Sequence, residues 1–350
     1  MIKKNSLNAT RCGNLLHLEM NTFLVIKSVK TSLTRAQPAW VNNPSETQRG
    51  TFSTLQKPPL TPDFFQWLVG VVDGDGDFSF NSYNNSWQFC FKISQSSYNC
   101  RLLYFIKSNL RVGKITIVEQ NGAAYYRVRD LQILMEQILP IFEEYPLLTY
   151  KYLLFDLFRK ALLIKLSKPA NWFNQITELK IEYNKIKILS RDCKSNELPK
   201  SIRSPVWKTV SDCFPEHQVK KIMTKAWLVG FTEAEGSFYI YKKDQRRMAH
   251  AFEITQKHDA IVLQAITVIL PVKLGSKKNY IRVKSPTIDS NDKISNYFFK
   301  TMKGMKALEF RLWSRSFNKR KRGFEYLQAM QRKMRQIRSI KWRQNLEKRN

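Results

Sequence analysis

The feature that most constrains this chain is an internal repeat. The segment WLVGVVDGDGDFSF at 67–80 returns as WLVGFTEAEGSFYI at 227–240, 160 residues further along. Three later segments recur in the same order, pairing 91–95 with 252–256, 125–129 with 280–284, and 149–158 with 304–313. Because four matched blocks in one order indicate duplication, the 350 residues predict two copies of one domain.

Within each copy the residue pattern predicts the same succession of elements. In the first copy a helix begins at Thr61 and Pro62, a favoured N-cap and a favoured first helical residue, and runs to the acidic turn. Alternating apolar residues after that turn predict antiparallel strands. The remaining expected elements are a helix at about 97–110, a hairpin ending at 125–129, and helices around 130–143 and 149–164. The expected fold class is therefore α+β, with two tandem αββαββα domains.

Changes in composition and the positions of the prolines suggest the domain boundaries. We expect a leader at 1–60, a first domain at 61–190 that ends in a trailing helix, a proline-containing linker at 191–218, a second domain at 219–315 and a basic, helical tail at 316–350. The leader lacks a continuous apolar run, so it is not a secretory signal; an organelle-targeting segment and a disordered leader both remain open. The tail fits either a solvated segment or one that binds a nucleic-acid backbone.

The charge of the chain points to its partner. Lys and Arg number 59 against 28 Asp and Glu, a net charge of +31. Such a balance predicts a polyanionic partner, although an RNA-coating or ribosomal protein would share it.

No uninterrupted apolar stretch reaches the roughly 18 residues of a membrane span. The five cysteines form no C-x-x-C pair and the four histidines complete no zinc spacing.

Small residues recur on the first helix of each copy. Gly70 and Gly74 lie four residues apart, as do Gly230 and Ala234. Residues at that spacing share one helix face and let two backbones approach closely. We therefore expect the two helices to pack against each other about a pseudo-two-fold axis.

Such packing would bring Asp75 and Glu235 together at the C-terminal ends of these helices. Carboxylates are unfavourable there unless a cation compensates them, and with backbone carbonyls they suit Mg²⁺. Acids that merely cap turns are the alternative. A calcium-binding loop starting at Asp73 fails, because Phe78 and Asn84 stand where Gly and Glu are required.

The segments LVGVVDGDG at 68–76 and LVGFTEAEG at 228–236 resemble the two signature motifs of double-motif LAGLIDADG homing endonucleases. The resemblance extends over about 62–315. It implies that the motif helices form the domain interface and that two curved antiparallel sheets lie along the DNA major groove. It also implies divalent-metal-dependent hydrolysis of one phosphodiester per strand.

The resemblance assigns roles to matching residues. The metal would be held by the carboxylates of Asp75 and Glu235 and the backbone carbonyls of Gly74 and Ala234. The residues that position water would be Gln95 and Gln256. The basic residues near the scissile phosphate would be Lys151 and Lys306. The alternatives are that the glutamines only terminate strands and that the lysines are only solvated.

Strand alternation nominates the side chains that would read DNA. In the first copy these are Ser79, Asn81, Gln88, Lys92, Arg127 and Arg129; in the second they are Tyr239, Tyr241, Lys243, Arg282 and Lys284. Some of them could contact phosphate alone.

The sequence thus predicts a monomeric endonuclease that cuts a long, near-palindromic double-stranded DNA target and promotes the mobility of an organellar group I intron. The expected organelle is the mitochondrion, with the chloroplast as the alternative. The runner-up function is an RNA-binding maturase that helps its own intron to splice. Retention of both motif acids, both glutamines and both lysines favours the nuclease.

Overall fold

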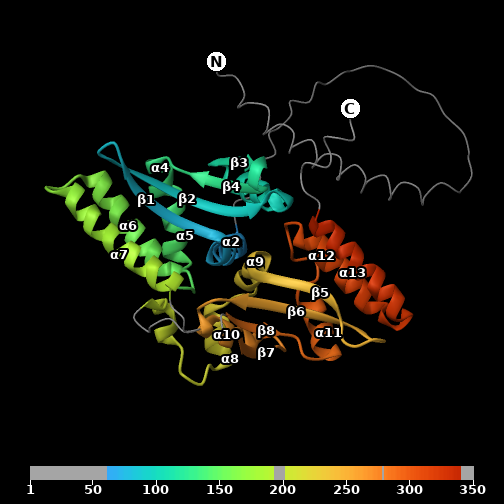
Figure 1. Cartoon of the computed structure of the whole chain (residues 1–350). Helices are drawn as coiled ribbons and strands as arrows, with labels where there is room; N and C mark the ends of the chain where they lie inside the picture. Colours follow the sequence, from blue (N-terminus) through green and yellow to red (C-terminus); the bar gives the residue numbers. More distant parts are fainter. Residues whose placement is uncertain (1–60, 193–201, 278–279, 340–350) are drawn as a thin grey trace, which may run out of the picture. The chain divides into compact units, whose positions relative to one another are not determined.

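The computed structural model describes residues 61–192, 202–277 and 280–339. Within them the chain forms two α+β repeats, each built on a four-stranded antiparallel sheet (Figure 1). The strand orders are β1-β2-β4-β3 and β5-β6-β8-β7, so both sheets have the same topology. The predicted fold class and duplication are confirmed.

The first repeat follows the predicted order of elements. Its elements are α2 (Pro62–Asp75), β1 (Gly76–Tyr83), β2 (Ser86–Ser96), α3 (Cys100–Leu110), β3 (Lys114–Val118), β4 (Ala123–Val128), α4 (Leu131–Ile133) continuing through a π-helical turn into α5 (Leu139–Glu144), α6 (Lys151–Ser167) and α7 (Trp172–Asp192).

The second repeat follows a connecting segment that is itself partly helical. That segment contains η5 (Pro205–Thr209) and α8 (Glu216–Ile222). The elements of the second repeat are α9 (Lys225–Glu235), β5 (Gly236–Lys242), β6 (Met248–Gln256), α10 (Ala260–Ile269), β7 (Lys273–Lys277), β8 (Tyr280–Lys284), α11 (Ile288–Tyr297), α12 (Lys306–Asn318) and α13 (Phe324–Ser339). The connecting segment packs on the first repeat, because Trp207 Nε1 donates to the Leu148 carbonyl at 2.7 Å.

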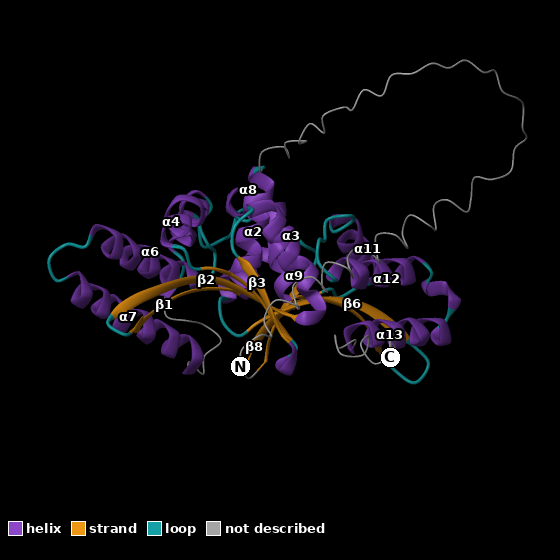
Figure 2. Ribbon diagram, turned by 90° about the horizontal axis from the view of Figure 1, so that it is seen from above, coloured by secondary structure: helices purple, strands orange, loops and turns teal. Residues whose placement is uncertain are grey.

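Each sheet buries one face against helices. Phe78 of β1 packs its ring on Phe142, Phe155 and Phe158, and its counterpart Phe238 packs on Phe298, Phe310 and Trp313. Figure 2 shows α6 and α12 on the same side of the strands as the motif helices α2 and α9. The other face carries the half-buried and exposed residues that alternate with this core along each strand.

The two motif helices pack at backbone contact distance. A Cβ added at Gly70 would lie 2.0 Å from the Trp227 carbonyl oxygen, and one at Gly230 would lie 1.9 Å from that of Trp67. One turn further on, a Cβ at Gly74 would lie 2.3 Å from the Cβ of Ala234. The predicted packing of small residues is confirmed, and its reciprocity makes the interface pseudo-symmetric.

The last helix of each repeat covers the outer edge strand of its sheet. On α7, Tyr183 Oη donates to the Phe78 carbonyl at 2.5 Å. On α13, Arg338 Nη2 donates to the Phe238 carbonyl at 2.7 Å, and Leu327 and Met334 are buried. These helices close strand edges that would otherwise expose unpaired carbonyls. The predicted leader at 1–60 and residues 340–350 of the predicted tail lie outside the described residues.

Among the helices in the described part of the chain, none combines the length and apolar character that crossing a bilayer requires.

Candidate active site at the ends of the motif helices

The two motif acids are the last residues of α2 and α9. A Cβ added at Gly74 would lie 3.2 Å from Glu235 Cγ, so the glutamate side chain lies against the end of the first motif helix. Burial raises the pKa of Asp75 to about 6; the charges of Lys151 and Lys306 oppose this shift, and the charge of Glu235 adds to it. The acids therefore share one electrostatic environment, as the sequence predicts.

Gln95, one residue before the end of β2, contacts the first acid directly. Its Nε2 donates to Asp75 Oδ2 at 2.5 Å, while its Oε1 accepts from Asn99 Nδ2 at 2.9 Å. Gln256 is the last residue of β6 and is half-buried. Within the ranges that the structure describes, the Gln256 side chain makes no hydrogen bond, so the two glutamines are not held alike.

Both predicted lysines begin a helix and reach back to a motif. Lys151 is the first residue of α6, and its Nζ donates to the carbonyls of Gly74 at 2.5 Å and Val72 at 3.2 Å. Lys306 is the first residue of α12, and its Nζ donates to the Gly236 carbonyl. Burial lowers the pKa of both ammonium groups, and nearby carboxylates oppose that shift.

A second pair of acids lies two residues before the first. Asp73 accepts from the Leu148 amide at 2.9 Å, from the amide and hydroxyl of Thr149 at 3.0 and 2.6 Å, and from Trp227 Nε1 at 2.8 Å. Glu233 accepts from the amides of Lys303 and Gly304. These buried acids hold the turns that lead into α6 and α12, and so place Lys151 and Lys306.

The sequence interpretation missed this role of Asp73 and Glu233. The available signal was their recurrence at equivalent positions of both motifs. Their partners are mostly backbone amides about 70 residues away, which no local pattern reveals.

The site fits a divalent cation of the Mg²⁺ type. It offers two carboxylates of like charge, Asp75 and Glu235, at helix ends that are already electronegative. Gly74 and Ala234 directly precede them, and the Gly74 carbonyl accepts a hydrogen bond from Lys151. No cluster of three or more His, Cys, Asp or Glu suited to a metal occurs among the described residues. Water would therefore complete the coordination shell, which Mg²⁺ favours.

The predicted DNA-reading side chains share the face of each sheet opposite the helices. The residues that lie on strands and alternate with buried neighbours are Ser79, Asn81, Gln88, Lys92, Arg127, Tyr239, Tyr241, Arg282 and Lys284. Arg129 and Lys243 follow the ends of β4 and β5 directly. Strand register pairs Lys92 with Arg127, which concentrates positive charge on this face.

Acids on the same face orient several of these basic groups. Lys92 Nζ lies 3.5 Å from Asp77 Oδ2, and Arg282 Nη1 lies 3.5 Å from Glu253 Oε1. Tyr239 Oη donates to Glu253 Oε2 at 2.6 Å. The sheet surface is therefore an ordered network of polar side chains before any partner binds.

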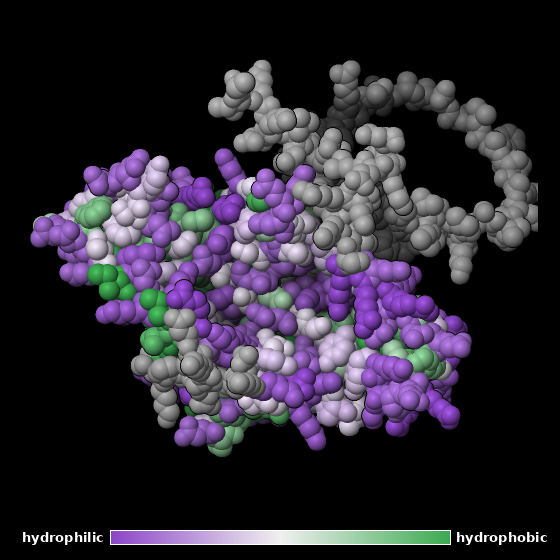
Figure 3. All heavy atoms as spheres, in the orientation of Figure 1, coloured by the Kyte–Doolittle hydropathy of each residue, from purple (hydrophilic) through white to green (hydrophobic). Residues whose placement is uncertain are grey.

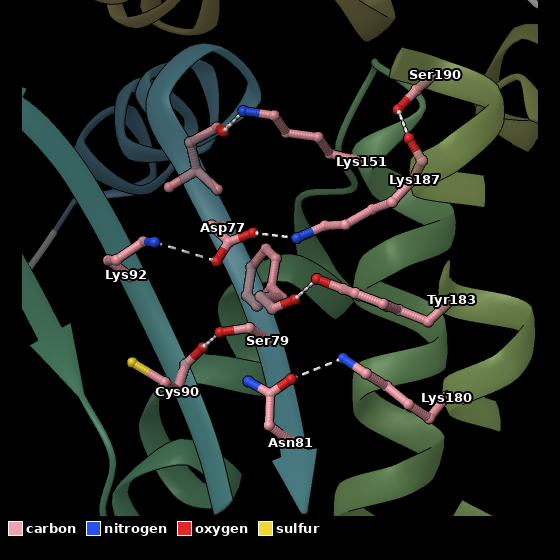
Figure 4. Close-up of polar contacts among 12 residues, drawn as sticks. Asp77, Ser79, Asn81, Cys90, Lys92, Lys151, Lys180, Tyr183, Lys187 and Ser190 are labelled. Atoms are coloured by element: carbon pink, nitrogen blue, oxygen red, sulfur yellow. Dashed lines mark hydrogen bonds and ion pairs between the residues drawn. The ribbon is translucent and has the colours of Figure 1, made fainter. Parts of the chain in front are cut away.

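Helix α7 adds two lysines to this face, and alternation along strands could not predict them. Figure 4 shows Lys180 and Lys187 extending from α7 toward β1, where they meet Asn81 and Asp77 at 2.9 Å each. Burial alone would raise the pKa of Asp77, but the charges and hydrogen bonds of Lys187 and Lys92 outweigh it and hold that pKa below its usual value. The surface predicted to face DNA in the first repeat thus includes its edge helix.

Comparison with known proteins agrees with this arrangement. The family model described as LAGLIDADG endonuclease matches residues 68–162 and 228–317. The chain is 37% identical over 279 residues to a probable intron-encoded endonuclease, Cox1-I1b, of Schizosaccharomyces pombe, covering 75% of this chain and 66% of that protein. It is 24% identical over 212 residues to the uncharacterized mitochondrial protein RF1 of Saccharomyces cerevisiae, covering 58% of this chain and 38% of that protein.

The chain spans about two thirds of the first relative and less of the second. Among solved structures it is similar in fold to I-SmaMI bound to an uncleaved DNA target in the presence of calcium ions, with a TM-score of 0.60, 18% identity, and coverage of 78% of this chain and 97% of that one. The family model covers more than half of the chain, with one motif in each repeat, and the protein therefore belongs to the LAGLIDADG endonuclease family.

Proposed function

We propose that this protein is a site-specific double-strand DNA homing endonuclease encoded by a mobile intron. The observation that carries this proposal is the convergence of both motif acids and both lysines at the adjoining ends of α2 and α9. The similarity to a probable intron-encoded endonuclease of Schizosaccharomyces pombe supports the same activity.

The residues of the site divide the chemistry of phosphodiester hydrolysis. A Mg²⁺ ion held by Asp75 and Glu235 would supply Lewis-acid stabilisation of charge on the phosphate. Lys151 and Lys306 offset the negative charge that develops on the phosphate oxygens, each from the N-terminus of its helix. Gln95, already fixed by two hydrogen bonds, orients the attacking water in the first repeat.

The target is double-stranded DNA with two similar but unequal half-sites. Protein symmetry is mirrored in DNA, and the two sheets carry different residues at equivalent positions. One chain holds both repeats, so it acts as a monomer on a near-palindromic site. Figure 3 shows a surface dominated by hydrophilic residues over α12 and α13, and the net charge of +31 favours a polyanionic partner.

The mitochondrion is the proposed location, because the relative from Saccharomyces cerevisiae is a mitochondrial protein by name. An RNA-binding maturase remains the alternative function, and the experiment below separates the two.

The test is a selection from a pool of randomised DNA duplexes, incubated with the protein and Mg²⁺, followed by sequencing of the cut ends. We expect one family of asymmetric, near-palindromic sites, each cut once per strand. The proposal fails if no duplex is cut and the protein binds its intron RNA more tightly than any duplex at the same salt concentration; the maturase would then be favoured.

A further inference from the structure

Asn99 and Asp259 occupy equivalent positions in the two repeats, at the N-caps of α3 and α10. An N-cap side chain normally accepts a hydrogen bond from an amide of its own first turn. Neither Asn99 nor Asp259 does so. Both side chains are instead buried and directed at another part of the molecule.

Each of these side chains reaches the opposite repeat. Asn99 Oδ1 accepts from the Met305 amide at 2.8 Å, and Asp259 Oδ1 accepts from the Tyr150 amide at 3.0 Å. Met305 and Tyr150 are the N-caps of α12 and α6, so each immediately precedes a lysine of the site. Unpaired amides at a helix start need such acceptors, and here the other half of the molecule supplies them.

Two acceptors from different repeats therefore hold each lysine-bearing turn. In front of α12, Glu233 of the same repeat accepts hydrogen bonds from the amides of Lys303 and Gly304, and Asn99 accepts one from the next amide. In front of α6, Asp73 accepts hydrogen bonds from the amides of Leu148 and Thr149, and Asp259 accepts one from the next amide. The same division occurs twice, which an accidental contact would not produce.

Asp259 makes this contact from an uncommon backbone conformation. Its backbone lies in the left-handed region, with φ of 61°, although it is not glycine. Its carboxyl group is buried, and burial raises its pKa to about 7. Strain of this kind persists where the surrounding structure requires it, and such positions cluster at functional sites.

We propose that Asn99 and Asp259 are positioning residues, each of which fixes the position of the catalytic lysine in the opposite repeat. This inference rests on the proposed nuclease function. It implies that cleavage of the DNA strand served by Lys151 depends on a residue of the second repeat, and cleavage of the strand served by Lys306 on a residue of the first. These two hydrogen bonds then connect the repeats in addition to the packing of the motif helices.

Asp259 is the cleaner of the two to test, because Asn99 also donates to Gln95. A duplex carrying a different label on each strand is cut by the full chain and by Asp259→Ala. The variants Lys151→Met and Lys306→Met identify which strand each lysine serves. Asp130→Ala is the matched control, since Asp130 caps α4 at 2.9 Å on the surface of the first repeat.

We expect Asp259→Ala to slow, by roughly tenfold, only the strand that Lys151→Met slows, because a small misplacement of a catalytic group is costly. Asp259→Asn keeps the oxygen acceptor and should cut both strands at nearly the normal ratio. The proposal is overturned if Asp259→Ala slows the strand served by Lys306, slows both strands equally, or cuts like the wild-type protein.

Amide hydrogen exchange tests the cross-repeat contact without any cleavage. Asp259→Ala should speed exchange of the Tyr150 amide at least about tenfold while leaving Met305 unchanged, and Asn99→Ala should do the reverse. Protection that survives in both variants contradicts the proposal. If the wild-type protein cuts no duplex, the nuclease function fails, whereas the exchange result still decides the contact. If Asp259→Ala does not fold, Asn99→Ala gives the mirror-image test.

Discussion

At the scale of single residues, the four motif acids divide into a structural pair, Asp73 and Glu233, and the proposed metal-binding pair, Asp75 and Glu235. Asp73 is 3% exposed and surrounded by hydrogen-bond donors, whereas Asp75 is half-buried and faces Glu235 and two lysines. Two residues of separation on one helix thus produce opposite environments.

From the raised pKa of Asp75 we predict how the metal requirement changes with pH. Burial and the Glu235 carboxylate raise the pKa of Asp75 to about 6, against the opposing charges of Lys151 and Lys306 and the hydrogen bond from Gln95. Below that value a proton competes with the cation. Lowering the pH from about 7.5 to about 5.5 should raise the Mg²⁺ concentration for half-maximal cleavage roughly fourfold. An unchanged requirement, measured by titrating Mg²⁺ at both pH values, contradicts this view of the site.

Asp73→Asn should destabilise the fold. An amide has one acceptor oxygen where the carboxylate has two, and its NH₂ group would face the donors of Leu148, Thr149 and Trp227. We expect a loss of about 2–4 kcal/mol in the free energy of unfolding, measured by urea denaturation. Asp63→Asn, on the exposed first turn of α2, is the control and should change that free energy by less than about 1 kcal/mol. Equal effects of the two substitutions would exclude a structural role specific to Asp73.

At the scale of elements, the contact between α2 and α9 depends on the absence of a side chain at Gly70 and at Gly230. Gly70→Ala places a Cβ 2.0 Å from a backbone oxygen of Trp227, which cannot move without displacing α9. We expect a destabilisation of more than about 3 kcal/mol, together with loss of cleavage. Gly275→Ala in β7, whose added Cβ would approach only Arg282 Nε at 4.0 Å, should cost less than about 1 kcal/mol. A Gly70→Ala variant as stable as Gly275→Ala would contradict the observed packing.

Helix α7 makes a separate prediction about DNA affinity. Lys180 and Lys187 project onto the face of β1 that is proposed to contact DNA. If both neutralise phosphates, the double variant Lys180→Ala/Lys187→Ala should reduce the slope of log affinity against log salt by up to about 1.8. Lys220→Ala, on α8 beside Glu216, is the control and should leave the slope unchanged. An unchanged slope in the double variant would show that α7 supports the sheet without contacting DNA.

At the scale of the whole molecule, duplication made much of the structure predictable. Because every block recurs, the order of elements, the motif interface and the outward-facing strand residues could be inferred from spacing and alternation. The roles of Asn99 and Asp259 could not, since their partners are backbone amides more than 100 residues away and Asn or Asp is common in any turn. Nor could the sequence reveal that Lys151 contacts Gly74 whereas Lys306 contacts Gly236.

The most direct test of the whole account is cleavage of a plasmid carrying one selected target by purified wild-type protein, Asp75→Asn and Glu235→Gln. DNA binding is measured in Ca²⁺ and cleavage in Mg²⁺. We predict that the wild-type protein yields full-length linear plasmid only with Mg²⁺, and that both variants bind the target but leave it uncut on at least one strand. Linear product from either variant at the wild-type rate would contradict the assignment of the two motif acids as the centre of catalysis.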